Sequence, residues 1–273
     1  MKTIKILICK LAIFGLKLLG RGGSFPGSLG MILDKNMMNY FKMPKLVIAV
    51  TGSAGKGSTT TIIAKVLRRS GYKVGHNYNG GNMNPGILTT LIDSSNLKGE
   101  SLVDALVLEV DERYTKEIFD IVKPNYVIVT NICRDQPPRH GNVDLVYDKI
   151  REALNSNMHL VLNGDDPYLR KFNLNNEFEV TYYGIDKNKY SYKENKFNNI
   201  NIYYCPVCNN KLKYNYYHIE SIGDYYCDKC GFKRKDIHPH SNYFYQFFTG
   251  LRYLSFHKFA EDMSIKAKNK HPA

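Results

Sequence analysis

The chain has 273 residues, a formal net charge of +13 and 43% hydrophobic residues. This length can bury one main domain core together with a smaller unit. The charge is uneven: residues 1–45 carry eight basic and one acidic side chains, 186–273 carry fifteen and eight, and 46–185 carry fifteen and sixteen. A near-neutral centre with basic flanks is not the pattern of a duplex-reading protein, so we expect no nucleic-acid partner.

The first twenty residues are apolar but are interrupted by Lys5, Lys10 and Lys17. They leave no uncharged span for a membrane helix and no uninterrupted core for a signal peptide. We expect an amphipathic helix, then a glycine- and proline-rich connector over 20–30, in an N-terminal arm over 1–44. Association of this helix with the inner face of a membrane is a secondary expectation.

A glycine-rich loop follows the apolar run 46–50, which has the length of a buried parallel strand. Apolar residues then repeat at helical spacing over 62–67, so the loop leads into a helix N-terminus, where main-chain N–H groups and the helix dipole favour a phosphate. Lys56 adds a positive charge and is a predicted catalytic residue. The hydroxyl of Ser58 or Thr59 would reach Mg²⁺, and Ser58 is the predicted ligand. The predicted nucleotide-binding residues of the loop are Thr51, Gly52, Ser53, Ala54, Gly55, Lys56, Gly57, Ser58 and Thr59.

The loop departs from the usual phosphate-loop pattern at two positions. Val50 stands where the pattern has its first glycine, and Gly57 is an additional glycine before the hydroxyl residues. A glycine turn without a ligand is the alternative interpretation, and the strand and helix on either side of the loop disfavour it.

Apolar runs alternate with helix-like segments through the middle of the chain. The runs cover 46–50, 72–76, 104–110, 126–130 and 158–162, the helix-like segments cover 115–122 and 144–154, and a polar glycine-rich stretch covers 77–86. This alternation predicts an α/β fold with a mostly parallel sheet and helices on both faces. Ligands of such sheets bind at the carboxyl ends of the strands.

Polar side chains stand at those predicted strand ends. Glu109 follows a buried run and is the favoured Mg²⁺ ligand and a second catalytic residue, with Asp111 and Glu112 close behind it. A solvated acidic turn is the alternative. Asn131, Asn163 and Asp165 follow the next two runs, and we expect them to contact the nucleotide.

Four of the six cysteines form two pairs. Cys205-x-x-Cys208 and Cys227-x-x-Cys230 have the spacing of a zinc ribbon, which places four thiolates around one structural Zn²⁺. Disulfides are the alternative, but an ATP-type loop in the same chain favours the reducing cytoplasm. We interpret Cys9 and Cys133 as packing residues.

Seven tyrosines surround the paired cysteines. They can stack on nucleic-acid bases or cover the small ribbon and pack it on the main sheet, and we favour the second role. These residues are Tyr203, Tyr204, Tyr214, Tyr216, Tyr217, Tyr225 and Tyr226.

Together these motifs resemble the central domain of the Mur ligases. The resemblance rests on Thr51-Gly-x-x-Gly-Lys, Glu109, Thr130-Asn131 followed by Asp135 and Arg139-His140-Gly141, and Asn163-x-Asp165-Asp166-Pro167. The four-cysteine ribbon, His76-Asn77 and Arg134-Asp135-Gln136 make the chain similar to one group of that family, the MurT subunits of lipid II isoglutaminyl synthase. The similarity covers roughly residues 10–235.

The resemblance implies a domain plan. An ATP-binding central domain of the Mur ligase type would cover 45–200, with the zinc ribbon inserted over 201–235 and an atypical tail over 236–273. The family continues past the ribbon with further strands and a C-terminal domain, which the tail does not resemble, so we expect a chain that lacks this part.

The resemblance also implies an activity. Such a subunit is a cytoplasmic ATP-dependent carbon–nitrogen ligase of peptidoglycan synthesis, with ATP, Mg²⁺ and Zn²⁺ bound. It phosphorylates the α-carboxylate of the D-glutamyl residue of lipid II, and ammonia from the glutaminase partner GatD converts the acyl phosphate to D-isoglutamine. Gly57 leaves a folylpolyglutamate synthase-like ligase open, and the short chain leaves a non-catalytic ATP- and zinc-binding module open. Lys149 lies near the position of a carbamoylated lysine in many Mur ligases, and we interpret it as a surface helix residue.

Overall fold

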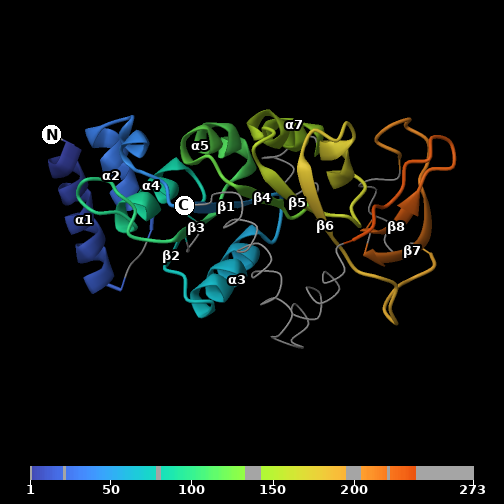
Figure 1. The fold of residues 1–273 in the computed structure, drawn as a ribbon, viewed down its shortest axis with the longest axis horizontal. Helices are drawn as coiled ribbons and strands as arrows, with labels where there is room; N and C mark the ends of the chain where they lie inside the picture. Colours follow the sequence, from blue (N-terminus) through green and yellow to red (C-terminus); the bar gives the residue numbers. More distant parts are fainter. Residues whose placement is uncertain are drawn as a thin grey trace.

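A six-stranded sheet forms the centre of the protein (Figure 1). The computed structural model describes residues 2–20, 23–77, 81–132, 143–194, 204–219 and 222–237. The strand order is β2-β3-β1-β4-β5-β6, and each neighbouring pair is parallel. The strands are β1 (Leu46–Thr51), β2 (Val74–His76), β3 (Ala105–Glu109), β4 (Tyr126–Val129), β5 (His159–Asn163) and β6 (Glu179–Tyr183). The predicted fold class is confirmed.

Helices cover both faces of the sheet. Helix α3 (Lys56–Arg69) lies on one face, and α5 (Thr115–Val122) and α7 (Val143–Ala153) lie on the other (Figure 1). Along β1, Val47 and Ala49 belong to the core on the α5 and α7 side, whereas Ile48 and Val50 pack with α3. Because both faces of each central strand are buried, the sequence shows continuous apolar runs rather than an alternating pattern.

The strand order explains where a ligand site belongs. Strand β1 lies between β3 and β4, and the chain leaves β1 toward β2 at one edge before it returns through β3 and crosses to β4 on the other side. The register pairs Val50 with Glu109 and Thr51 with Val129, so the three strands end together. Doubly wound sheets bind ligands at this kind of reversal of strand order.

The N-terminal arm contains one more helix than the sequence predicted. The amphipathic helix is present as α1 (Lys2–Leu18), but the predicted connector over 20–30 is wrong from residue 25 onward, where α2 (Phe25–Leu33) begins. Pro26 lies in the first turn of α2, where proline is tolerated. A Cβ at Gly27 would lie 1.8 Å from the carbonyl oxygen of Pro85, so this glycine permits close helix packing rather than a flexible link.

The partner of α2 is a second helix that the sequence did not predict. Helix α4 (Asn84–Asp93) begins inside the stretch 77–86, with Pro85 in its first turn. Cys9 of α1 is fully buried in the core that these helices share, which confirms its packing role. The short 3-10 helices are η1 (Met37–Tyr40), η2 (Glu112–Tyr114) and η3 (Leu169–Asn173).

The cysteine-rich segment forms an antiparallel hairpin, β7 (Lys213–Ile219) and β8 (Ile222–Tyr226). It lies beside β6, at the end of the molecule opposite α1 (Figure 1). Tyr225 is fully buried and its hydroxyl donates to the carbonyl of Gly164, and Tyr216 is also buried, so the packing role is confirmed for these two tyrosines. Tyr204, by contrast, is 57% exposed.

Within the described part of the chain, no helix combines the length and the hydropathy that crossing a bilayer requires.

Candidate nucleotide and metal sites

The glycine-rich loop is tightly curled between β1 and α3. Gly52 has φ 124° and Gly55, which caps α3, has φ 79°, conformations that side chains with a Cβ rarely adopt. A Cβ at Gly52 would also lie 2.5 Å from the hydroxyl oxygen of Thr130. The loop therefore holds the N-terminus of α3 at the end of the central strand, which is the geometry that favours a bound phosphate.

Residues at the end of β4 hold this loop in place. The backbone N–H of Ala54 donates to Asn131 Oδ1 at 3.0 Å, and the N–H of Ser53 donates to the Asn131 carbonyl at 2.9 Å. The hydroxyl of Thr130 donates to the carbonyl of Ala54 at 2.7 Å. Asn131 was predicted to contact the nucleotide, and the structure shows that its side chain shapes the phosphate loop.

Lys56 folds back over the loop. Its Nζ donates to the carbonyl oxygens of Gly52 at 2.5 Å and Ser53 at 3.1 Å, and it forms an ion pair with Glu112 Oε2 at 3.2 Å. The Lys56 side chain is 13% exposed and that of Glu112 is 3% exposed. The ammonium group is thus held among oxygen atoms at the mouth of the loop.

Glu112 is a residue of the candidate site that was not predicted as a binding or catalytic residue. It was noted only as part of an acidic cluster, with Glu109 favoured over it. The structure places Glu112 at the start of η2, nearly buried and facing Lys56. The signal in the sequence was the cluster itself, because three acidic residues, Glu109, Asp111 and Glu112, stand directly at the end of a buried strand.

Asp111, the remaining acid of the cluster, has a structural task. It caps η2 by accepting the N–H of Arg113 and forms an ion pair with the Arg113 guanidinium at 2.7 Å. Burial alone would raise the pKa of Asp111, but these contacts with Arg113 lower it below its usual range.

Glu109 lies where a metal ligand is expected. A Cβ at Gly57 would lie 3.0 Å from Glu109 Oε2, so the carboxylate lies against the first turn of α3. Asn82 donates to Glu109 Oε1 at 3.0 Å, and the amide of Asn77 bridges the backbone N–H and carbonyl of Glu109 at 2.7 Å each. Gly57 therefore has a local purpose: it leaves room for this carboxylate.

The predicted Mg²⁺ ligands belong to the same small region. Ser58 is exposed on the first turn of α3, one residue beyond Gly57, whereas Thr59 is buried. A serine hydroxyl and a carboxylate that is already oriented by an amide are the oxygen donors that Mg²⁺ prefers. The residues present therefore fit the predicted ion.

The two residues predicted after β5 have different surroundings. Asn163 ends β5 and accepts the N–H of Asp165 at 3.1 Å. Asp165 is 1% exposed, and its two oxygens accept hydrogen bonds from Arg234 Nε and the Ile185 N–H, each at 2.7 Å. Burial raises the pKa of Asp165, while the Arg234 guanidinium acts to lower it. These contacts join the turn after β5 to Ile185 and to Arg234 of the ribbon segment, and the nucleotide contact of Asp165 stays a prediction.

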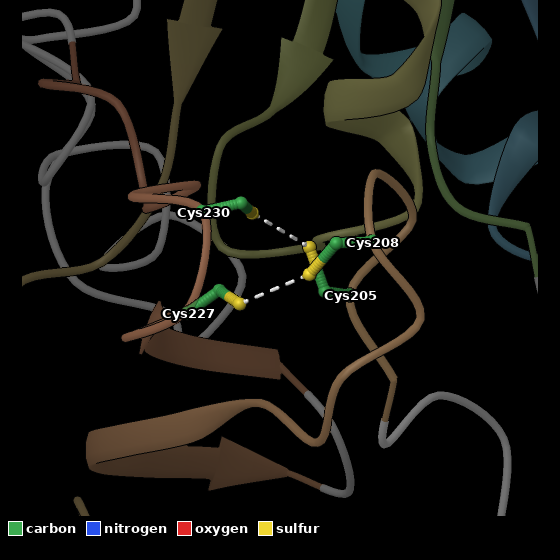
Figure 2. A group of neighbouring side chains, drawn as sticks. All are labelled: Cys205, Cys208, Cys227 and Cys230. Atoms are coloured by element: carbon green, nitrogen blue, oxygen red, sulfur yellow. Dashed lines mark hydrogen bonds between the residues drawn. The ribbon is translucent and has the colours of Figure 1, made fainter.

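The four paired cysteines converge on one point (Figure 2). Their sulfur atoms all lie within 4.8 Å of one another, with Cys205–Cys230 and Cys208–Cys227 each at 3.5 Å. Four thiolates at Zn–S distances of about 2.3 Å in a tetrahedron lie about 3.8 Å apart, so this arrangement fits zinc. Burial would raise the pKa of Cys227, but the N–H groups of Cys230 and Lys229 help to lower it to about 7.

Several predicted residues lie elsewhere. Lys149 is exposed on α7 and pairs with Glu152 at 3.5 Å, as expected of a surface helix lysine. Six motif residues of the resemblance fall outside the described ranges, as does the predicted packing residue Cys133; the six are Arg134, Asp135, Gln136, Arg139, His140 and Gly141.

The curled loop at the end of a central parallel strand, with a lysine and two carboxylates beside it, defines a nucleotide-binding α/β protein of the phosphate-loop class. The Mur ligase middle domain matches residues 50–225. The chain belongs to the Mur ligase family of ATP-dependent amide ligases.

Within this family, the chain is similar to MurT subunits. The chain is 33% identical over 190 residues to the MurT subunit of the glutamine-hydrolysing lipid II isoglutaminyl synthase of Streptococcus pneumoniae, covering 68% of this chain and 41% of the relative. The Staphylococcus aureus MurT subunit is 30% identical over 177 residues, with 64% and 39% covered. This chain thus spans about two fifths of the length of these relatives.

Solved structures support the fold. A pseudomurein peptide ligase type C from Methanothermus fervidus aligns with a TM-score of 0.56 at 24% identity, over 74% of this chain and 39% of that one.

Proposed function

We propose that this chain is the ATP-binding part of a ligase subunit that activates the D-glutamate α-carboxylate of lipid II for amidation. The phosphate loop with Lys56, Glu109 and Glu112 supports the ATP-dependent half of this proposal. The similarity to MurT subunits, together with the four-cysteine cluster, supports the choice of acceptor.

The residues suggest how the nucleotide is held. The N-terminus of α3 and the loop N–H groups bind the β- and γ-phosphates, and Lys56 exchanges its contact with Glu112 for a phosphate oxygen. Ser58 and Glu109 would hold Mg²⁺, which when bound neutralises the phosphate charge. The protein contributes positioning and charge, and needs no covalent chemistry of its own.

The proposed reaction has two steps. A carboxylate oxygen of the acceptor attacks the γ-phosphorus, which forms the acyl phosphate and releases ADP. Ammonia then attacks the acyl carbon, the C–O bond to phosphate breaks, and loss of a proton leaves the amide. The relatives are subunits of a glutamine-hydrolysing enzyme, so we propose that a glutaminase of the GatD kind supplies the ammonia.

Gly57 is the residue that left the folylpolyglutamate synthase-like alternative open. Gly57 resembles the loop of that group, but the structure gives the glycine a local purpose beside Glu109 that does not depend on the acceptor. The four-cysteine cluster supports the MurT-like acceptor instead.

The acyl phosphate offers a direct test, because hydroxylamine converts it to a stable hydroxamate. The chain with Mg²⁺–ATP, hydroxylamine and lipid II should form hydroxamate and ADP, and Lys56→Ala should form neither. Product with folate and glutamate instead of lipid II would favour the alternative ligase. ATP binding with no product from either acceptor would favour a non-catalytic module.

A further inference from the structure

Helix α1 presents an apolar stripe to the outside of the molecule. Five large residues recur every three or four positions and are between 42% and 73% exposed; they are Ile4, Leu7, Leu11, Phe14 and Leu18. Ile8 and Leu19, also exposed, widen the stripe. Large contiguous apolar surfaces on a protein mark an interaction site.

The orientation of this stripe is fixed by the rest of the arm. The opposite face of α1 buries Ile6, Cys9 and Ile13. Three lysines beside that face fasten the helix at 2.7 to 2.8 Å: Lys5 to Asp34, Lys10 to the Ile92 carbonyl and Lys17 to Asp93. The stripe therefore points outward because the helix is held, and α1 forms one end of the molecule (Figure 1).

The charge around the stripe identifies its partner. Helix α1 contains no acidic residue, and residues 1–45 carry eight basic side chains against one acidic. Near the N-terminal end of the helix, the exposed Lys2, Lys42 and Lys98 are close enough to Glu100 for their charges to act on its carboxylate. An exposed apolar face on an arm with this excess of positive charge matches the boundary between the headgroups and acyl chains of an anionic bilayer.

A second copy of the chain fits this surface less well. The stripe has the spacing of a coiled-coil seam, but it covers little more than two heptads, fewer than a stable coiled coil needs. Pairing two such helices would bring two positively charged arms together, with no acid on either α1 to offset the charge.

We propose that α1 is an interfacial helix that docks the protein on an anionic lipid surface through this stripe. The helix lies in the plane of the interface, with its apolar side chains in the acyl boundary, and the positive charge of the arm attracts the anionic headgroups. The contact is independent of the reaction proposed above, although it would bring the phosphate loop to the surface where a lipid-linked acceptor is found.

Co-sedimentation of the full chain with phosphatidylglycerol–phosphatidylcholine vesicles tests this proposal. We expect binding that Leu11→Glu with Phe14→Glu weakens by about a hundredfold, since each substitution should cost about tenfold in partitioning. Leu145→Glu, a comparably exposed leucine on α7, should bind like the wild type. Pure phosphatidylcholine vesicles and high salt should both weaken binding, because they remove the electrostatic part.

Three results would overturn the proposal. The first is that the wild type does not bind anionic vesicles, and the second is that the double variant binds them as well as the wild type. The third is that the wild type self-associates in solution without binding vesicles, and that the double variant no longer self-associates. Thermal unfolding and ATP binding of the double variant distinguish loss of docking from loss of fold or of the nucleotide site.

Discussion

The ion pair between Lys56 and Glu112 predicts that the protein restrains its own phosphate-binding lysine. At an effective dielectric constant of about 20, two unit charges 3.2 Å apart attract with about 5 kcal/mol. Only part of this opposes nucleotide binding, because Lys56 exchanges one set of oxygen ligands for another. We take about 1.4 kcal/mol as the net cost, which corresponds to a tenfold change in affinity.

Glu112→Gln removes the charge and keeps the shape of the side chain. We expect the variant to bind metal-free ATP about tenfold more tightly than the wild type, because Lys56 loses its ion pair and a carboxylate no longer faces the phosphates. Isothermal titration with ATP in EDTA measures this affinity. Glu117→Gln, an exposed glutamate on α5, is the matched control and should change nothing.

The outcome separates two roles of Glu112. Unchanged or weaker binding of metal-free ATP by a folded Glu112→Gln protein would refute the restraint. If the same variant lost affinity only when Mg²⁺ was present, Glu112 would be a metal ligand beside Glu109.

Three further predictions concern the loop, the β5 turn and the ribbon. Gly57→Ala should weaken Mg²⁺–ATP binding about tenfold by displacing Glu109, yet raise the free energy of unfolding by up to about 1 kcal/mol through helix propensity. Titration with Mg²⁺–ATP should show the loss of affinity and urea unfolding the gain in stability, whereas unchanged ATP affinity would contradict the assignment of Glu109. Complete burial raises the pKa of Asp166 to about 6, so the folded state holds this proton more tightly than the unfolded state. The free energy of unfolding should therefore fall by about 2 kcal/mol between pH 4 and pH 6, out of about 3 kcal/mol over the whole titration. Urea unfolding of Asp166→Asn should lack that contribution, and pH profiles that run parallel to the wild type would refute it. Protein purified without chelator should carry about one equivalent of zinc, and its removal or Cys208→Ser should lower the melting temperature; a metal-free chain of equal stability would exclude the zinc site.

The parts of the fold that the sequence predicted are those with a local pattern. The buried strands, the phosphate loop and the paired cysteines are each recognised from the residue types and spacing within a short segment, without information on which distant segments pack against it. Glu109 was predicted for the same reason, because it ends an apolar run.

The errors arose where tertiary packing overrides local preference. Because of their glycines and prolines, 20–30 and 77–86 were predicted to be irregular. In the structure, however, Gly27 allows α2 to pack closely against the Pro85 carbonyl of α4, where a larger side chain would not fit. The ion pair of Asp165 was not predicted because its partner, Arg234, lies sixty-nine positions away in the ribbon segment. Glu112 was underrated because nothing local shows that it reaches Lys56 across fifty-six positions.

The most direct test of the nucleotide site is titration of the chain with Mg²⁺–ATP. The wild type should bind, and Lys56→Ala should lose at least about a hundredfold in affinity, because it removes the only ammonium group that the loop motif supplies. Lys65→Ala, an exposed lysine on the same helix, should bind like the wild type. Equal affinity in the Lys56→Ala protein, or no binding by the wild type, would contradict the assignment of residues 52–59 as a triphosphate cradle.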